Sequence, residues 1–173
     1  MTAVFETERL RLFELTLDDA PFIVRQLNEP SFVRNIADRG VRTVEQAADY
    51  LRNGPLASYA SHGFGLWRIE RKSDGASLGM AGLLQRASLD HPDVGYALLP
   101  EHWGEGYASE AAAGCVARAR HHYRWPRLMA IVLPTNAPSI RVLERLGFTY
   151  LRRIHLDPDP AELSLYTLDL VSS

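Results

Sequence analysis

The sequence has a single cysteine and a single lysine, and both scarcities restrict the chemistry of the chain. With Cys115 alone, no intramolecular disulfide can form, and a reducing compartment fits. Of the nineteen basic residues, Lys72 is the one lysine, and it lies in a polar, turn-forming stretch. A phosphate-loop NTPase is excluded because its Gly-Lys-Ser/Thr element is absent, and a pyridoxal Schiff-base enzyme is disfavoured because it needs a buried lysine.

The chain also lacks a strong charge imbalance and a long apolar run. Its formal net charge is −2, which provides no basic field for nucleic acid or an anionic membrane. No stretch approaches the roughly 18 apolar residues of a membrane span. Charged residues between Glu6 and Arg11 interrupt the N-terminus before an apolar signal core could form. We therefore expect a cytoplasmic protein without a nucleic-acid or membrane partner.

Length and patterning predict one globular domain over residues 1–173, with mixed secondary structure. The composition, 46% hydrophobic and 23% charged, is that of an ordinary folded domain. Apolar residues alternate with charged ones from Thr7 to Leu15, as in a strand, whereas Thr43 to Gln46 form a helix capping box. The mixture predicts an α/β or α+β class with a mixed sheet. The expected strands are residues 7–15, 64–70, 76–84, 94–99, 128–133, 148–154 and 163–170, and helices are expected from Thr16, from Thr43, after Gly106 and from Pro138.

The segment between Pro100 and the following Ala-rich helix is the most informative one. Gly104 and Gly106 lie at the start of this helix, where backbone N–H groups have no intrahelical partner and the helix dipole favours an anion. A phosphate or pyrophosphate is the expected ligand, although glycines that merely end a strand explain the pattern equally well. A Rossmann loop fits poorly because Ser109 replaces its third glycine. The helix carries a stripe of small residues through Cys115 and must lie close against a sheet.

The loop itself, WGEGYASEA at residues 103–111, is similar to the acetyl-CoA pyrophosphate loop of the GNAT N-acetyltransferases, Gln/Arg-x-x-Gly-x-Gly/Ala. Trp103 replaces the Gln or Arg, and this departure resembles the RimJ/RimL-like branch, the ribosomal-protein N-terminal acetyltransferase-like enzymes. Residues 7–12, 94–96 and 136–148 resemble further segments of the same branch, in the same order. The resemblance extends over nearly the whole chain, from about residue 5 to 170.

The resemblance implies a fold and a reaction. The fold would be a mixed, mostly antiparallel central sheet of about six to seven strands flanked by helices. The reaction would be acetyl transfer from acetyl-CoA, the co-substrate, to a primary amine of a protein N-terminus or a small molecule, without a metal. Dimers are common in this superfamily, so a homodimer is an expected state. A non-catalytic acyl-CoA-binding or regulatory module, and a transferase that uses another acyl-CoA, remain as alternatives.

The resemblance also implies roles for individual residues. The backbone of Leu98 and Leu99 would pair with the pantetheine arm as an added strand would, and Leu98 N–H would serve as an oxyanion donor. Asn136 and Ser139 would contact the pantetheine and the sulfur end. The pyrophosphate loop would consist of Trp103, Gly104, Glu105, Gly106, Tyr107, Ala108 and Ser109.

The acid and the base are less well defined. Many GNAT enzymes place a tyrosine seven positions after the residue that corresponds to Asn136, where this chain has Leu143. The branch therefore suggests Ser139 as the acid. Alternatively, the Ser139 hydroxyl only caps the start of the helix. Asp93 aligns with a frequent Glu and is the candidate base, although an ordinary residue at the start of a strand explains it too. Because no base is unambiguous, we expect an α-amine acceptor, which is already partly neutral at pH 7.

Other features of the sequence are better explained by structure than by chemistry. Residues 75–79 fit the hydrolase pattern Gly-x-Ser-x-Gly, but a charged turn precedes them and a strand-like run follows. The six histidines are scattered, so no metal site is expected. Cys115 and the aromatic residues at 59–67 are expected in the core rather than at a reactive site.

Overall fold

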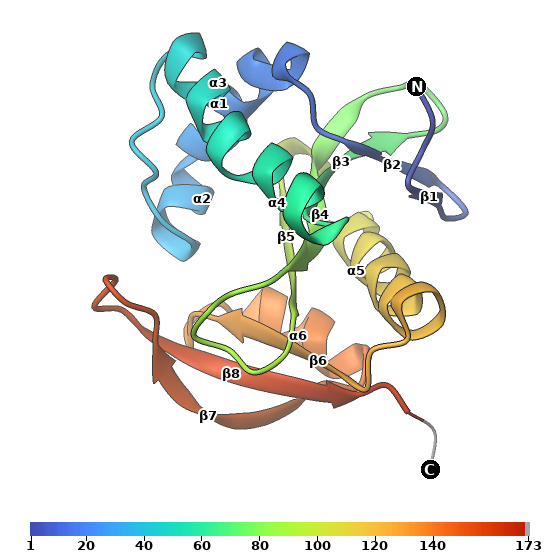
Figure 1. Cartoon of the computed structure of the whole chain (residues 1–173), viewed down its shortest axis with the longest axis vertical. Coiled ribbons are helices and arrows are strands. Elements are labelled where there is room, and N and C mark those ends of the chain that lie inside the picture. Colours follow the sequence, from blue (N-terminus) through green and yellow to red (C-terminus); the bar gives the residue numbers. More distant parts are fainter. Residues whose placement is uncertain (172–173) are drawn as a thin grey trace.

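The computed structural model describes residues 1–171, which form an eight-stranded sheet with helices on both faces (Figure 1). The strands are β1 (Phe5–Glu6), β2 (Leu10–Glu14), β3 (Leu66–Arg71), β4 (Ser77–Leu84), β5 (Asp93–Leu98), β6 (Arg127–Val132), β7 (Thr149–His155) and β8 (Glu162–Asp169). Their order is β1-β2-β3-β4-β5-β6-β8-β7. The mixed, mostly antiparallel sheet confirms the expected fold class, with eight strands rather than six to seven.

The additional strand is β1, which precedes the expected strand at 7–15, and that strand itself begins only at Leu10. The two-residue β1 pairs antiparallel with β2, and the chain turns between them. In this turn Thr7 N–H donates to the Leu10 carbonyl, 2.9 Å away. The side chains of Thr7 and Arg9 both donate hydrogen bonds to the carboxylate of Glu110 on α5. Residue alternation alone could not reveal this long-range contact.

Helices fill the connections between strands. They are α1 (Ala20–Asn28), α2 (Pro30–Asn35), α3 (Val44–Asn53), α4 (Pro55–His62), α5 (Tyr107–Arg118) and α6 (Ala137–Arg145), with single turns at Leu17–Asp19, Pro100–His102 and Ala119–Tyr123. Thr43 caps α3 with the expected capping box, because its hydroxyl accepts from Gln46 N–H. The sequence analysis missed α2 and α4. They begin at Pro30 and Pro55, because proline suits the first turn of a helix, where its missing N–H has no partner to lose.

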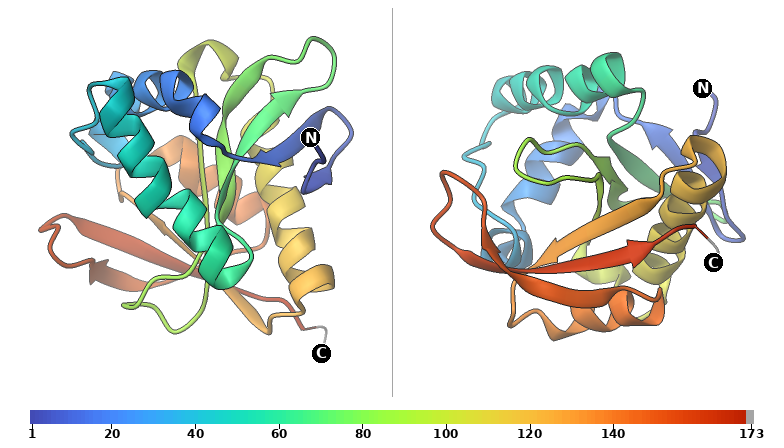
Figure 2. Two further views of the ribbon diagram at one scale, coloured as in Figure 1. Left: turned by 45° about the horizontal axis from the view of Figure 1, so that its top comes forward. Right: turned by 60° about the horizontal axis from the view of Figure 1, so that its bottom comes forward.

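The two faces of the sheet are covered by different helices (Figure 2). Side chains of α1 and α3 pack with Met80 and Ala97 of the sheet, whereas side chains of α5 pack on the opposite face with Trp67 and Val94. The close approach of α5 that its small residues predict is confirmed. A Cβ at Gly114 would press on the ring of Phe5.

The sheet opens between β5 and β6. Within the described chain these strands form the one parallel pair, and their register holds a single pair of residues, Asp93 and Met129. Beyond that pair β6 diverges from β5 (Figure 1), while α5 connects them. The rest of β5 therefore has a partner strand, β4, on one side. Among residues 1–171, no helix has the length and apolarity needed to cross a membrane.

Candidate active site

The backbone of β5 lines the opening between β5 and β6. Leu99 donates its N–H to the Leu78 carbonyl of β4, 2.9 Å away. Because hydrogen-bonded and non-bonded residues alternate in an antiparallel pair, the N–H groups of Tyr96 and Leu98 turn toward the opening. An extended ligand can therefore add beside β5 as a strand would. Of the two residues expected to pair with pantetheine, Leu98 has this orientation, whereas the N–H of Leu99 is bonded to β4.

The loop after β5 presents backbone N–H groups at the N-terminus of α5. Gly104 and Gly106 both have left-handed φ angles, of 82° and 81°, which explains why the loop needs glycine at these positions. A Cβ at Gly104 would meet none of the described atoms within 4 Å, so a ligand can approach the backbone there. The indole Nε1 of Trp103 donates to the Leu98 carbonyl, 3.1 Å away, and so ties the loop to β5. The loop thus combines unpaired helix N–H groups with open space, as an anion site requires.

Glu110 holds this loop in place, a role that the sequence analysis missed. Its carboxylate accepts from Thr7 Oγ1 at 2.5 Å, from Arg9 N–H at 2.8 Å and from Arg9 Nε at 2.7 Å. Arg9 Nη1 in turn donates to the Glu105 carbonyl, 2.9 Å away, and its guanidinium lies 4.3 Å from the centre of the Tyr107 ring. Burial opposes ionisation, but these bonds hold the pKa of Glu110 below its ordinary value. Glu110 therefore joins the segment before β2 to the first turn of α5.

A hydroxyl pair lies on the α5–α6 face of β5. Asn136 caps α6, and its Oδ1 accepts from Ser139 N–H at 3.4 Å. The Tyr96 hydroxyl lies 2.9 Å from Ser139 Oγ and 3.1 Å from the Ser139 carbonyl oxygen. Burial raises the pKa of Tyr96 to about 12, although the bond to Ser139 lowers it. Leu143, at the position where many GNAT enzymes have tyrosine, is 1% exposed and belongs to the core.

Asp93 lies on the other face of β5. It shares that face with its register partner Met129, which packs with Leu89 of the β4–β5 loop. Arg86 Nε donates to Asp93 Oδ1 at 3.1 Å, whereas Oδ2 has no hydrogen-bond partner among the described residues. The residue is 1% exposed. Burial raises the pKa of Asp93 to about 6, and the charge and hydrogen bond of Arg86 limit the rise.

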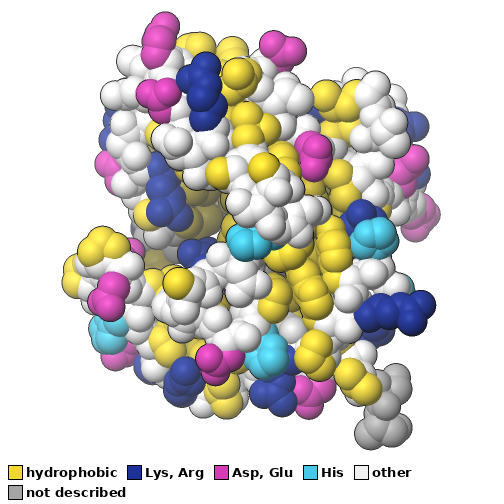
Figure 3. Space-filling view, viewed as in Figure 1, with side chains coloured by type: hydrophobic (Ala, Val, Ile, Leu, Met, Phe, Trp, Pro, Cys, Tyr) yellow, Lys and Arg dark blue, Asp and Glu magenta, His cyan; other side chains and the backbone are white. Residues whose placement is uncertain are grey.

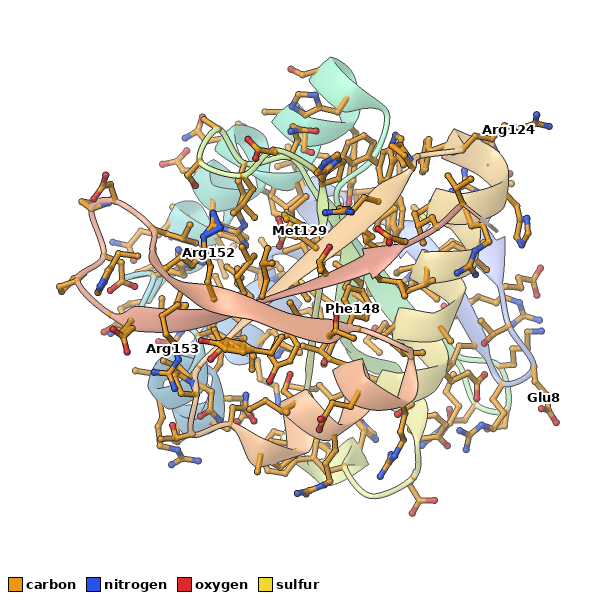
Figure 4. All side chains as sticks on the ribbon, turned by 90° about the horizontal axis from the view of Figure 1, so that it is seen from below. Glu8, Arg124, Met129, Phe148, Arg152 and Arg153 are labelled. Carbon is orange, nitrogen blue, oxygen red and sulfur yellow. The ribbon has the colours of Figure 1, made fainter. Side chains whose placement is uncertain are left out.

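Basic side chains lie beside a hollow near the β7–β8 loop. Figure 3 shows a hollow between the region of α2 and the β7–β8 loop, with apolar side chains inside it and basic side chains beside it. Arg152 and Arg153 leave β7 in opposite directions (Figure 4), and Arg153 pairs with Glu162 at 2.7 Å. Burial raises the pKa of Tyr50 on α3, and the charges of Arg39 and Arg86 lower it.

The remaining candidates have structural roles. Tyr59 accepts from Leu15 N–H at 3.0 Å and donates to the Leu66 carbonyl, while Trp67 is 1% exposed, so these aromatic residues belong to the core. Ser77, in the hydrolase-like pattern, lies within β4 and accepts from an arginine. Residues 1–171 contain no cluster of three or more His, Cys, Asp or Glu side chains that could hold a metal.

Comparison with known proteins decides the family. A model of the acetyltransferase (GNAT) domain family matches residues 9–149. The chain belongs to the GNAT acetyltransferase family. A curated relative, the uncharacterized N-acetyltransferase YoaA of Bacillus subtilis (strain 168), is 28% identical over 149 residues, which cover 86% of this chain and 84% of YoaA. This GNAT chain is therefore an acetyltransferase enzyme, as the loop motif predicted.

Solved structures share the fold of this GNAT chain. An acetyltransferase from Agrobacterium tumefaciens str. C58 superposes with a TM-score of 0.79 at 26% identity, over 97% of this chain and 94% of that one. RimL, a ribosomal L7/L12 α-N-protein acetyltransferase in complex with coenzyme A, gives a TM-score of 0.82 at 14% identity, over 97% of this chain and 98% of RimL. At that identity the likeness to RimL shows the fold, and it leaves the RimJ/RimL-like branch as a prediction.

Proposed function

We propose that this protein is an acetyl-CoA-dependent N-acetyltransferase of the RimJ/RimL-like type that acts on the α-amine of a peptide or an amino acid. The observation that carries the proposal is the opening between β5 and β6, which leads directly to the glycine loop at the N-terminus of α5. One extended molecule with a diphosphate at one end and an acyl thioester at the other fits both features.

Acetyl-CoA is the expected occupant on chemical grounds. Its diphosphate would accept from the N–H groups of residues 104–109, close to the guanidinium of Arg9. Its pantetheine amides would pair with the backbone groups of Tyr96 that face the opening, with Asn136 across the opening. Trp103 would then position the loop through its bond to the Leu98 carbonyl rather than contact the diphosphate with a donor. The coenzyme A bound in the RimL structure supports this assignment.

The side chains on the two faces of β5 suit the attacking amine and the departing sulfur of an acyl transfer. The amine nitrogen would form a bond to the thioester carbonyl carbon, and the carbon–sulfur bond would break, so that the electron pair stays on sulfur. Asp93, on one face, would take the proton that the amine loses. The N–H of Leu98 would stabilise the charge on the carbonyl oxygen, and Ser139, on the other face, would donate to the departing sulfur.

The surroundings of Asp93 favour α-amines over polyamines. An α-amino group has an ordinary pKa of about 7.7–8.0 and is partly neutral at pH 7, whereas a lysine-like amine near 10.4 is almost fully protonated. Arg86, which pairs with Asp93, and Arg39, whose charge together with that of Arg86 lowers the pKa of Tyr50, would repel an acceptor with several positive charges. A carboxylate near the amine would instead be attracted. These charges favour an amino acid or a short peptide.

A screen of acceptors tests the proposal. Wild-type protein and Asp93→Asn would be mixed at pH 7 with acetyl-CoA and one acceptor at a time: dipeptides with a free α-amine, amino acids, an α-blocked lysine, spermidine and an aminoglycoside. The release of CoA thiol and the mass of the product would be measured. We expect turnover of α-amines that falls in Asp93→Asn. A strong preference for ε-amines or polyamines would refute the acceptor assignment, and binding of acetyl-CoA without turnover would favour the regulatory module.

A further inference from the structure

The contact between Tyr96 and Ser139 joins two elements that are far apart in sequence. Tyr96 lies on β5 and Ser139 in the first turn of α6. The phenol oxygen is 2.9 Å from Ser139 Oγ and 3.1 Å from the Ser139 carbonyl oxygen. The contact therefore joins β5 to the helix that follows β6, and β5 and β6 are the two strands that border the opening.

Counting hydrogens gives this pair two arrangements. Tyr96 has one hydroxyl hydrogen, and so has Ser139. If Ser139 donates to the phenol oxygen, Tyr96 can donate its own hydrogen to the Ser139 carbonyl, and no serine hydrogen is left for a ligand. If Tyr96 donates to Ser139 Oγ, the serine hydrogen can point into the opening. The second arrangement presents the serine hydrogen to sulfur.

We propose that Tyr96 is a positioning residue, whose hydroxyl donates to Ser139 Oγ and turns the serine hydrogen toward the sulfur of the thioester. This inference rests on the proposed function. It assigns a role to Tyr96, which lies outside the glycine loop and is not at the position where many GNAT enzymes have their tyrosine, Leu143 in this chain. As the carbon–sulfur bond breaks, Ser139 donates to the sulfur that gains the electron pair, and Tyr96 holds the serine in that orientation.

Tyr96 supports the hydrogen bond without giving up its proton. Its buried hydroxyl has a pKa of about 12, whereas an ordinary thiol has a pKa of about 8.5. Proton transfer from the phenol to a thiolate is therefore unfavourable by more than three pKa units. The phenol stays protonated over the working pH range and remains a donor. The proton that completes free CoA comes from the amine, through the base or through water.

Kinetics on four variants test this role. Tyr96→Phe removes the hydroxyl and keeps the ring, Ser139→Ala removes the second hydroxyl, and the double variant removes both. Tyr123→Phe is the matched control, because the Tyr123 hydroxyl donates to the Gly63 carbonyl at 3.2 Å, outside the opening. We expect kcat to fall about tenfold in Tyr96→Phe, with the Kd for acetyl-CoA changed less than about twofold.

Coupling between the two hydroxyls distinguishes positioning from independent effects. The double variant should be no slower than Ser139→Ala, because Tyr96 acts through the serine. Ser139→Thr keeps a hydroxyl and should restore turnover, and Tyr96→Phe should again lower it in that background. Losses that multiply in the double variant would overturn the proposal, and so would a kcat unchanged in Tyr96→Phe.

A second measurement needs no acceptor. The thiol of bound CoA would be titrated through the ultraviolet absorbance of its thiolate. The thiol of Cys115 does not interfere, because it is buried and burial raises its pKa. Donors at the sulfur should lower the thiol pKa by about one unit in the wild type, and Tyr96→Phe and Ser139→Ala should each reverse this shift. If CoA binds but its thiol has the same pKa in all variants, the role of Tyr96 is refuted while the proposed function stands. If CoA does not bind, the proposed function itself fails.

Discussion

Replacing Asp93 with asparagine should stabilise the protein at neutral pH while it impairs the reaction. Burial raises the pKa of Asp93 from 3.8 to about 6, despite the ion pair with Arg86. One pKa unit corresponds to about 1.4 kcal/mol, so the ionised carboxylate costs the folded state about 3 kcal/mol relative to the unfolded chain. Asparagine removes this cost, and Arg86, with a side chain 32% exposed, can be hydrated instead.

The direction of the pH dependence follows from the raised pKa. Below pH 3.8 the carboxyl group is protonated in both the folded and the unfolded state, so the penalty is absent. As pH rises through 6, the folded state has to ionise Asp93, and the wild type loses stability that the variant keeps. Between pH 5 and pH 8 the advantage of Asp93→Asn in the free energy of unfolding should grow by about 1.4 kcal/mol.

Urea unfolding at several pH values between 5 and 8 measures this advantage. Asp169→Asn is the control, because Asp169 is 71% exposed and pairs with Arg127 at the surface. That variant should show no comparable pH-dependent gain. In parallel, wild-type kcat/KM should rise through an apparent pKa near 6 and again near the pKa of the acceptor. In Asp93→Asn the first rise should be absent, with kcat/KM at pH 7.5 lower by about 100-fold or more.

Two outcomes would refute this reasoning about Asp93. If Asp93→Asn destabilises the fold at pH 8, the ion pair with Arg86 outweighs the burial of the carboxylate, and the raised pKa is wrong. If the variant is stabilised but keeps its kcat/KM and its pH profile, Asp93 is buried without acting as the base. The two readouts together separate an error in the electrostatics from an error in the chemistry.

Two further predictions follow from the loop and the core. Arg9→Ala should weaken acetyl-CoA binding about tenfold in calorimetry, because it breaks the side-chain bonds of Arg9 to Glu110 and to the Glu105 carbonyl. Arg127→Ala, which breaks a surface pair, should leave the affinity unchanged. Equal affinities of Arg9→Ala and the wild type would refute the role of Arg9 in holding the loop. Cys115 should resist a thiol reagent in the native protein and react once the protein is unfolded, because it is fully buried and burial raises its pKa. Rapid labelling of the native protein would contradict the position of Cys115 in the core.

The local patterns of the sequence were enough for most of the framework. The capping box at Thr43 and the small-residue stripe around Cys115 predicted the start of α3 and the close packing of α5. Each depends on residues within a few positions of one another, which a helix brings together. The helices that follow Pro30 and Pro55 were missed, because proline both ends one helix and begins the next.

The site was less accessible to sequence reasoning because its contacts are long-range. The glycine loop and Asn136 are recognisable by spacing, but Glu110 meets Arg9 across about a hundred residues of chain. Tyr96 meets Ser139 in the same way, and no periodicity links a strand residue to a helix start in another part of the sequence. The burial of Asp93 depends on the β4–β5 loop and the neighbouring strand, so its raised pKa could not be read from its position before a strand.

The central claim is that acetyl-CoA binds at the glycine loop of α5, and titration calorimetry of Gly106→Val tests it most directly. Gly63→Val is the matched control, because Gly63 has a φ of 80° against 81° for Gly106 and caps α4 far along the chain from the loop. Both variants carry the same backbone strain, and circular dichroism would verify that both are folded. We predict one-to-one binding of acetyl-CoA to the wild type and to Gly63→Val, and none to Gly106→Val. Wild-type affinity in a folded Gly106→Val protein would contradict the assignment of the loop.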